Sequence, residues 1–208
     1  SEEDKNILMH IDYNILIAYG GIAKRINKGD FIFKQDSLPL FYYQVIKGEV
    51  RIFSSNTEDK FLTHNIVSEG EGFGESELLL NKPHLVSAQA LSAGVFVRIP
   101  KENFNNILKD FPDINQQLLH SLAEEIYDNI LLSQIWTAPT PEIKIELFLN
   151  RYKKQNQEKD KPEEKILIPY TRQQIADFTS LRVETVIRTL RKMSEQQKVK
   201  IVQHKVYF

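Results

Sequence analysis

The sequence of 208 residues contains no cysteine, only two methionines and a single tryptophan. The absence of cysteine excludes disulfides, thiolate nucleophiles and cysteine-ligated zinc or iron–sulfur clusters. Long apolar runs are also missing, because Ile15–Ala18 is far shorter than the roughly 20 residues that span a membrane. The acidic start, Ser1–Asp4, lacks the basic residues of a signal peptide. We therefore expect a cytoplasmic protein that has no membrane partner.

The whole chain has almost no net charge, but its N-terminal and C-terminal parts carry charges of opposite sign. The 27 Lys and Arg residues and the 28 Asp and Glu residues give a net charge of −1. Residues 139–208 hold 15 basic and 9 acidic residues, which leaves 12 and 19 for residues 1–138, so the two parts carry +6 and −7. This asymmetry favours a polyanion as the partner of the C-terminal part, with an ordinary solvated surface as the alternative.

Short segments rich in β-branched and aromatic residues follow one another between residues 22 and 100, and turn-forming residues such as Lys28–Asp30 and Gly70–Gly72 separate them. Evenly spaced short strands of this kind predict a sandwich or barrel and not a parallel sheet with crossover helices. The clearest of the expected strands are Phe31–Phe33, Phe41–Ile46, Glu49–Phe53, Leu62–Val67 and Val95–Ile99.

Two helices are expected after this β region, a short one over residues 102–110 and a long one over residues 114–136. One face of the long helix is expected to pack on the β domain. The other face is expected to pair with the same helix of a second copy of the chain, and the alternative is a helix covered entirely by its own chain. The residues assigned to this dimer helix are Leu119, Leu122, Ala123, Ile126 and Ile130.

A proline-containing segment, Thr137–Pro141, ends the long helix and is interpreted as a hinge. Pro141 suits the first turn of a further helix over Glu142–Lys154. Residues 155–165 contain no apolar side chain, which indicates an exposed loop, and a short strand is expected over Ile166–Ile168.

The segment Thr171–Leu190 predicts a helix-turn-helix. Thr171 suits the N-cap of its first helix, and Ala176 is small enough for two helices to pack closely. The second helix is expected to begin at Arg182, after a turn at Thr179–Leu181. Its apolar positions are Val183, Val186, Ile187 and Leu190, and a hairpin, or wing, is expected to follow around Gln203-His204.

The outer surface of the second helix carries Arg182, Glu184, Thr185 and Arg188 near its N-terminal end. This end of such a helix enters the major groove of DNA. There an arginine can bind guanine through two hydrogen bonds, and a glutamate can accept a hydrogen bond from cytosine. A structural helical hairpin with a solvated polar face is the alternative, but the wing and the local positive charge favour DNA binding.

Three motifs resemble those of one protein family, and they follow one another along the chain in the order typical of that family. Gln173–Ala176 followed by Glu184–Arg188 resembles the DNA-binding signature of the Crp/Fnr family of bacterial transcription regulators. Lys28–Asp36 with Tyr42–Val50 resembles the cyclic-nucleotide-binding β-roll of this family, and Gly72–Glu75 resembles the start of its phosphate-binding cassette. Residues 176–190 are also similar to regulators from Bacteroidetes.

The resemblance implies roles for residues of the C-terminal part. Glu184 and Arg188 would read base edges, and Arg182 and Thr185 would contact bases or phosphates. The sequence departs from the frequent Arg-Glu-Thr motif because Val183 stands directly before Glu184, so the half-site is expected to differ from the commonest one. The residues expected on the DNA backbone are Arg172, Gln173, His204 and, from the wing, Lys205.

The resemblance also places an effector pocket at Gly74, Glu75, His84 and Leu85. In members that bind cyclic AMP, an Arg and a Ser or Thr of the cassette bind the cyclic phosphate. His84 and Leu85 stand at these positions, and no arginine lies between Arg51 and Arg98. Because a buried phosphate without a cation is costly, tight binding of cyclic AMP is not expected.

Two further expectations concern the side chains of this pocket. His84 could bind a phosphate when protonated or ligate a haem, but a histidine in a solvent-facing loop is the favoured interpretation. Phe73 and Leu78–Leu80 are expected to fill the pocket mouth with their own side chains.

These patterns together predict an α+β fold with three parts. They are an antiparallel β-roll (a double-stranded, jelly-roll-like β-helix) in residues 1–112, a dimerisation helix and hinge in 113–138, and a winged helix-turn-helix in 139–208. The expected function is sequence-specific transcription regulation by a homodimer on a near-palindromic site, without dependence on cyclic AMP. Double-stranded DNA, a second copy of the chain and RNA polymerase are the expected partners.

Other function classes find less support in the sequence. No nucleophile–base pair and no glycine-rich phosphate loop is present, and the five histidines show no metal-ligand spacing, so an enzyme is not expected. No cofactor and no metal are predicted, an iron–sulfur cluster is excluded, and the effector stays unknown. The alternative is a nucleotide- or haem-sensing module whose C-terminal domain binds a protein.

Overall fold

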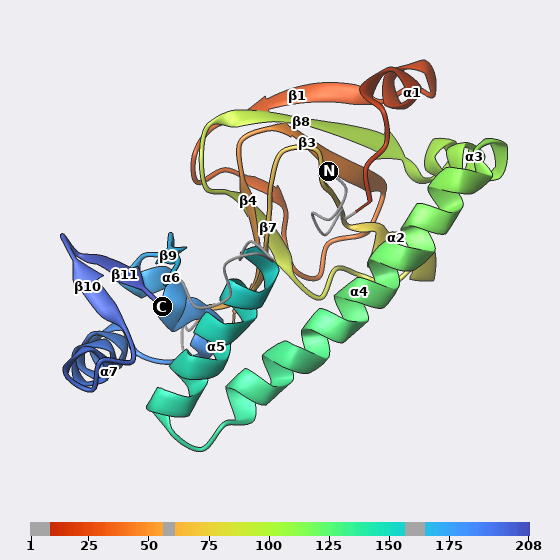
Figure 1. Ribbon diagram of the computed structural model, residues 1–208. Helices are drawn as coiled ribbons and strands as arrows, with labels where there is room; N and C mark the ends of the chain where they lie inside the picture. The colour runs from red at the N-terminus through yellow and green to blue at the C-terminus, as the bar shows by residue number, and fades with distance from the viewer. Residues whose placement is uncertain (1–8, 56–60, 157–164) are drawn as a thin grey trace. The chain divides into compact units, whose positions relative to one another are not determined.

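The computed structural model describes residues 9–55, 61–156 and 165–208. The chain divides into two compact units, the first built from residues up to Ser55 and Thr63–Tyr127, and the second containing Asp128–Phe208. The boundary falls within the helix α4 (Pro112–Thr137), so one continuous helix contributes to both units (Figure 1). Among the helices of the described residues, none has the length and apolar character needed to span a membrane.

Two four-stranded sheets form the first unit. One has the strand order β1-β8-β3-β6 and the other the order β2-β7-β4-β5. The strand pairs whose registers are resolved are all antiparallel, which confirms the predicted α+β fold with an antiparallel, jelly-roll-like N-terminal domain. The strands are β1 (Ile22–Ile26), β2 (Phe31–Phe33), β3 (Phe41–Lys47), β4 (Val50–Ser55), β5 (Phe61–Val67), β6 (Gly72–Phe73), β7 (Ser87–Ala90) and β8 (Gly94–Pro100).

Two apolar clusters stabilise this unit. One lies between the sheets and contains the aromatic residues Phe33, Tyr43, Phe73 and Phe96 together with valines of β3, β4 and β5. The other joins β3 and β8 to the helices, and buries Tyr42, Ile99 and Phe104 almost completely. Because strand side chains alternate between two faces, adjacent residues such as Tyr42 and Tyr43 serve different clusters.

Three helices flank the sheets, and the sequence predicted only one of them. The helix α3 (Lys101–Asp110) confirms the amphipathic pattern over residues 102–110. The helices α1 (Tyr13–Ala18) and α2 (Glu75–Leu80) were not predicted. Each has six residues, which is less than two turns and too short for a 3.6-residue periodicity to appear in the sequence.

The helix α4 has two apolar faces with different environments. Ile114 and Leu118 are buried in the cluster beside β3 and β8, and the side chain of Ser121 accepts a hydrogen bond from the backbone N–H of Met9 (3.2 Å). Leu119 and Ile126 are 62% and 63% exposed on another side of the helix. The long helix expected from the sequence is therefore present, and only one of its apolar faces is covered in the single chain.

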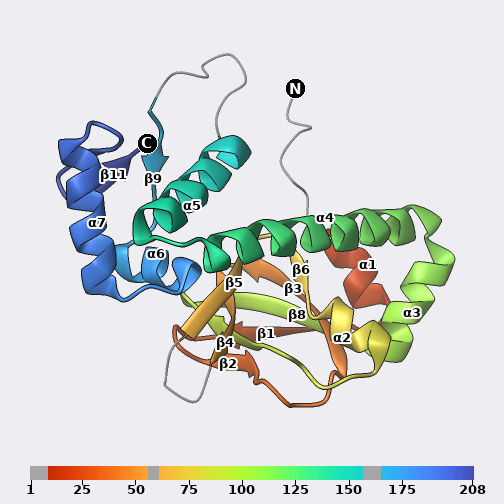
Figure 2. The same cartoon turned by 90° about the horizontal axis from the view of Figure 1, so that it is seen from below.

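The second unit contains three further helices and a small sheet (Figure 2). Apolar residues from each of its helices form the core between them, among them Ile145, Phe148, Leu149, Ile175, Val186, Leu190 and Met193. Its elements are α5 (Pro141–Asn156), β9 (Leu167–Ile168), α6 (Arg172–Thr179), α7 (Val183–Glu195), β10 (Lys200–Val202) and β11 (Lys205–Tyr207). The strand order is β10-β11-β9, and both pairings are antiparallel.

The boundaries in this unit agree with the sequence to within about a residue or two, the accuracy to which helix ends can be defined. The break at residues 138–140 separates α4 from α5, as expected of the proline-containing segment. The start of α7 differs from the prediction by one residue. Arg182 is extended and is the N-cap of the helix, so α7 begins at Val183. The loop was expected over residues 155–165, but α5 continues to Asn156, and residues 157–164 lie outside the described part of the chain.

Candidate functional site

A helix-turn-helix is formed by α6 and α7. Thr171 caps α6 in a capping box, in which its hydroxyl accepts from the N–H of Gln174 and the Gln174 side chain accepts from the N–H of Thr171. Ser180 adopts a left-handed conformation (φ 54°) and reverses the chain. Ala176 is 2% exposed, so α6 and α7 approach each other closely where the sequence places this small residue.

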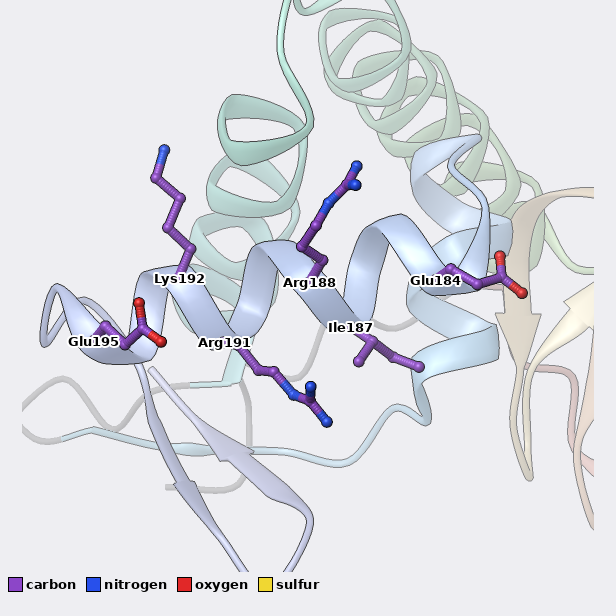
Figure 3. A pocket seen from close by; sticks show the side chains of 6 residues that line it. All are labelled: Glu184, Ile187, Arg188, Arg191, Lys192 and Glu195. Atoms are coloured by element: carbon purple, nitrogen blue, oxygen red, sulfur yellow. The ribbon is translucent and has the colours of Figure 1, made fainter.

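The outer face of α7 carries basic side chains in its middle and a glutamate near each end, around a shallow concavity (Figure 3). Arg188 and Lys192 extend from one side of the helix, and Ile187 and Arg191 extend from the other. Glu184 lines the same surface at the N-terminal end of α7, next to the turn. We call this surface the reading face; its lining residues are Glu184, Ile187, Arg188, Arg191, Lys192 and Glu195.

Sequence reasoning found only part of the reading face. Glu184 and Arg188 are exposed as predicted, as is Arg182, and Thr185 is half-buried. Ile187 was assigned to the apolar side of the helix, and this was wrong, because its side chain is 37% exposed and lines the outer surface. The spacing could not have shown this, because Ile187 is three or four residues not only from Glu184 and Arg191 but also from the apolar Val183 and Leu190.

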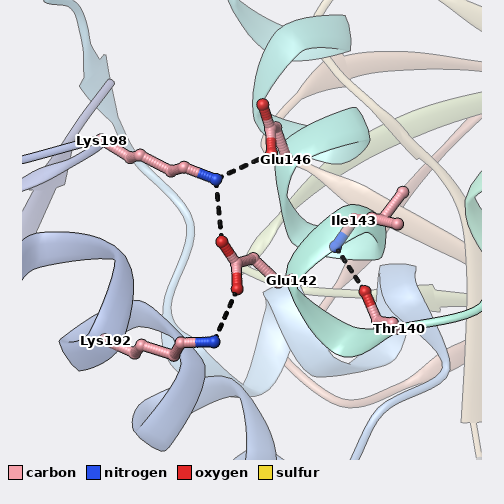
Figure 4. Close-up of polar contacts among 6 residues, drawn as sticks. All are labelled: Thr140, Glu142, Ile143, Glu146, Lys192 and Lys198. Atoms are coloured by element: carbon pink, nitrogen blue, oxygen red, sulfur yellow. Dashed lines mark hydrogen bonds and ion pairs between the residues drawn. The ribbon is translucent and has the colours of Figure 1, made fainter. Parts of the chain in front are cut away.

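A network of ion pairs holds the C-terminal end of α7 (Figure 4). The Glu142 carboxylate of α5 accepts from the Nζ of Lys198 at 2.8 Å and from the Nζ of Lys192 at 3.0 Å. Lys198 also lies 3.6 Å from an Oε atom of Glu146. The hydrogen bonds from Lys198 and Lys192 hold the pKa of Glu142 below its usual value. Lys192 is therefore partly neutralised by its own chain, whereas Arg188 and Arg191 have no such carboxylate partner among the described residues.

The predicted wing is the hairpin β10–β11. Val202 pairs with Lys205, so Gln203 and His204 form the two-residue loop. Both have positive φ (47° and 63°), which the type I′ turn of a two-residue hairpin requires. Val206 is fully buried and anchors the hairpin, and the side chains of His204 and Lys205 are exposed as their expected contacts with DNA require.

Two more of the residues expected to contact DNA, Arg172 and Gln173, lie at the start of α6. Arg172 is half-buried, and this burial lowers the pKa of its guanidinium group. Gln173 is exposed, and its side-chain amide donates to the Asp177 carboxylate at 2.8 Å. The structure therefore places Arg172 and Gln173 in the first turn of the helix, where the backbone N–H groups attract a phosphate.

Trp136 connects the last turn of α4 to this domain. Its indole N–H donates to the Phe178 carbonyl of α6 at 2.9 Å, and its own carbonyl accepts from Lys144 Nζ of α5 at 2.7 Å. Trp136 is therefore a packing residue of the second unit, next to the break between α4 and α5.

The region expected to hold an effector starts at Gly74, which has φ 84° and precedes α2. A side chain at this position would be strained, and its Cβ would lie 3.1 Å from the Tyr43 ring. Glu75 follows and is 6% exposed, with one carboxylate oxygen that has no hydrogen-bond partner among the described residues. Next to it, the Ser76 hydroxyl donates to Glu125 of α4 at 3.0 Å, so α2 is tied to the long helix.

His84 is buried, which corrects the expectation of a solvent-facing loop histidine. Its ring is 0% exposed and stacks on Phe33, with ring centroids 3.8 Å apart and an interplanar angle of 10°. Its Nδ1 lies 3.6 Å from a carboxylate oxygen of Glu77, and neither ring nitrogen has a hydrogen bond within the described part of the chain. The loop was predicted as exposed because a single polar residue beside a proline gives no periodic signal of burial.

Aromatic side chains occupy the interior next to His84. Phe33, Tyr43 and Phe73 pack against one another with centroid distances between 5.3 and 6.1 Å. Of the residues expected to fill the pocket mouth, Phe73 and Leu78 are buried, whereas Leu79 and Leu80 are 36% and 64% exposed and do not fill it. Leu85 is 73% exposed, and its side chain has neither a hydroxyl group nor a charge.

Two family models match the chain in the order found in the structure. The model of the cyclic nucleotide-binding domain matches residues 23–111, and the model of the Crp-like helix-turn-helix domain matches residues 145–207. The chain belongs to the Crp/Fnr family of transcription regulators. It is thus a DNA-binding transcription regulator and not an enzyme, and both predictions are confirmed.

Two curated relatives of this Crp/Fnr regulator are themselves named as regulators. It is 25% identical over 181 residues to the transcriptional activator protein Anr of Pseudomonas protegens, an alignment that covers 85% of this chain and 73% of the relative. It is 22% identical to the nitrogen fixation regulation protein FixK of Bradyrhizobium diazoefficiens, with 88% and 76% covered.

Solved structures share the fold of this regulator at low sequence identity. The c-di-GMP responsive global regulator CLP of Xanthomonas campestris matches with a TM-score of 0.76 and 18% identity, over 94% of this chain and 96% of that one. A CooA variant from Carboxydothermus hydrogenoformans matches with a TM-score of 0.74 and 15% identity, over 95% and 87%.

The residues of the effector region do not fit the phosphate of a cyclic nucleotide. The position at which the family resemblance places an arginine is held by the buried His84 ring, which stacks on Phe33. The neighbouring position is held by the exposed Leu85. A phosphate at this place would meet the aromatic carbon of Phe33, and it would lie close to the Glu77 carboxylate, which is 3.6 Å from His84 Nδ1 and would repel it when ionised.

The buried Glu75 should make the regulator less stable as the pH rises. Burial, together with the nearby Glu125 and Glu77 charges, raises the pKa of Glu75 from 4.5 to about 7. The folded protein therefore keeps a proton that the unfolded chain loses, so stability falls between pH 4.5 and about 7 and is constant above. The Glu75→Gln variant has no carboxyl group to ionise, so its stability should not fall in this way. We expect its free energy of unfolding to exceed that of the wild type by up to about 3 kcal/mol at pH 8 and to equal it near pH 4.5.

Differential scanning calorimetry across this pH range measures the effect as a difference in Tm. Glu102→Gln is the matched control, because Glu102 is an exposed residue of α3 and its replacement should leave the pH profile unchanged. Parallel pH profiles for the wild type and Glu75→Gln would contradict the assignment.

Proposed function

We propose that this regulator binds, as a homodimer, a near-palindromic site on double-stranded DNA. Two copies of α7, roughly 34 Å apart, would enter successive major grooves. The observation that carries the proposal is the reading face, where Glu184 and Arg188 are exposed on the helix that follows the turn. Glu184 and Arg188 contact base edges, and Arg182 and Thr185 contact bases or phosphates. Arg172, Gln173, His204 and Lys205 bind the DNA backbone.

The proposed organisation keeps three parts: a sensor-like β-roll in residues 1–112, the dimer helix and hinge in 113–138, and the winged helix-turn-helix in 139–208. The exposed apolar stripe of α4 supports the dimer, because Leu119, Ala123, Ile126 and Ile130 are all exposed along one side of the helix. Leu122 is half-buried and packs on the core of its own chain, so it contributes less to the seam than its neighbours. Such a protein acts in the cytoplasm, where RNA polymerase is a further partner.

The proposed regulator does not depend on cyclic AMP. If a ligand of other chemistry binds near Glu75, the hydrogen bond from Ser76 to Glu125 links its site to α4. Such a ligand would act by binding two arrangements of the dimer with different affinities. A sensor module whose C-terminal domain binds a protein is the competing function, and the DNA experiments below decide between the two.

Ile126→Glu should convert the dimer into monomers. The substitution places a carboxylate, and its symmetry mate, in an apolar seam, and burying two unpaired charges there is costly. We expect the dimer dissociation constant to rise more than tenfold, as measured by sedimentation velocity or multi-angle light scattering. Gln117→Glu is the control, since Gln117 lies on another side of α4. A dimer that is unaffected by Ile126→Glu would place the interface elsewhere.

Arg188→Ala and Arg172→Ala should affect DNA binding in different ways. The wild type first selects its site from a random pool of duplexes. Arg188→Ala should then lose about 1–3 kcal/mol on that site and relax the preference at one base pair. Arg172→Ala should weaken binding to selected and random DNA alike and lower the slope of log K against log salt by about one.

Fluorescence anisotropy with the selected duplex and a shuffled duplex, at several salt concentrations, measures both effects. Equal losses on the two duplexes would remove Arg188 from base reading. An unchanged salt slope would remove Arg172 from the phosphate contacts, and failure of the wild type to enrich any sequence would favour the protein-binding alternative.

Cyclic AMP should not stabilise the protein. A ligand that binds the folded state raises Tm in proportion to the logarithm of its concentration over its dissociation constant. Since His84 and Leu85 offer no cationic and hydroxyl pair, we expect no change in Tm at millimolar cyclic AMP. A rise of several degrees that Glu75→Gln abolishes would contradict this expectation.

A further inference from the structure

Ile187 stands out on the reading face because its neighbours there are charged. The other five lining residues are glutamates, arginines and a lysine, and Ile187 lies among them with 37% of its surface exposed. The remaining apolar residues of α7 that complete its inner side, Val186, Leu190 and Met193, are fully buried. Ile187 is therefore far more exposed than these residues and lies at the edge of the core.

The position and stiffness of the side chain suit a contact with a surface. Ile187 follows Glu184 by three residues and precedes Arg191 by four, so it lies on the same helical stripe (Figure 3). A β-branched side chain in a helix is held largely in one rotamer. It therefore loses little conformational entropy when it becomes covered, in contrast to the arginines beside it.

The chemistry of base edges limits what such a side chain can recognise. In the major groove, the C5-methyl group of thymine is the one apolar group that a standard base pair presents. An isoleucine facing any other base edge would remove water from donors or acceptors without replacing their hydrogen bonds. Contact with the methyl group gains apolar burial and loses no hydrogen bond.

We propose that Ile187 contacts the C5-methyl group of a thymine in each half-site and so determines the preference for that base. The inference rests on the proposed binding of DNA through α7 and adds a third base position to those read by Glu184 and Arg188. Ile187 selects thymine by its methyl group, and it disfavours other bases by desolvating their polar edges.

Deoxyuridine provides a direct test, because it differs from thymidine only by the missing methyl group and keeps every hydrogen-bonding group. Each thymine of the duplex selected by the full-length wild type is replaced in turn by deoxyuridine, symmetrically in both half-sites, and affinity is measured by fluorescence anisotropy. For the wild type we expect one position at which the replacement weakens binding about three- to fivefold per half-site. Ile187→Ser should bind the thymine and deoxyuridine duplexes equally at that position.

Ile143→Ser is the matched control, because Ile143 is an isoleucine of α5 with 40% exposure and lies outside the reading face. It should keep the wild-type difference between thymine and deoxyuridine. Ile187→Val keeps an apolar β-branched side chain and should retain most of the preference. Circular dichroism and thermal unfolding check that Ile187→Ser is folded, and Ile187→Ala takes its place if it is not.

Two outcomes would overturn the inference while leaving the proposed function intact. In one, the wild type binds its site specifically but no thymine is sensitive to deoxyuridine. In the other, Ile187→Ser keeps the same sensitive thymine as the wild type. If the wild type selects no sequence at all, the proposed function fails, and the role of Ile187 fails with it.

Discussion

The helix α4 must bury one apolar face within its own chain, and the rest of the structure depends on this packing. Ile114 and Leu118 complete the core beside β3 and β8, and Ser121 holds the backbone of Met9. With this face covered, Leu119, Ile126 and Ile130 have no place in the interior of the chain. Such an exposed apolar stripe is unfavourable in water unless another molecule covers it. The same packing that stabilises the β-roll thus prepares the surface for a second copy.

The helix-turn-helix positions its reading face by a different set of constraints. Capping by Thr171 fixes the start of α6, and the small Ala176 lets α7 approach. The Glu142 carboxylate then holds Lys192 and Lys198 at the far end of α7. Positive charge is consequently partly neutralised near the C-terminal end of the helix and remains available at Arg188 and Arg182, closer to its N-terminal end. This distribution favours contact with DNA through the end of the helix that enters the groove.

The β-roll keeps the family's architecture but differs in the chemistry of its interior. Glu75 stays buried, whereas the expected cation is replaced by a histidine that stacks on Phe33. Burial without a cationic partner raises the pKa of Glu75 to about 7, so this carboxyl keeps its proton only below that pH. The aromatic residues Phe33, Tyr43 and Phe73 fill the adjacent space. The fold of the domain is therefore retained with side chains that no longer suit a cyclic phosphate.

The α+β class, the long helix, the helix-turn-helix and the wing can all be predicted from the amino-acid sequence, because each depends on local periodicity, capping or turn residues. The exposure of Glu184 and Arg188 can be predicted in the same way. Which other side chains are buried depends on the three-dimensional fold. It buried His84 against Phe33, exposed Ile187 on the reading face, and formed the short helices α1 and α2. Burial at such positions depends on side chains that are distant in sequence, as Phe33 is from His84, and no local pattern records those contacts.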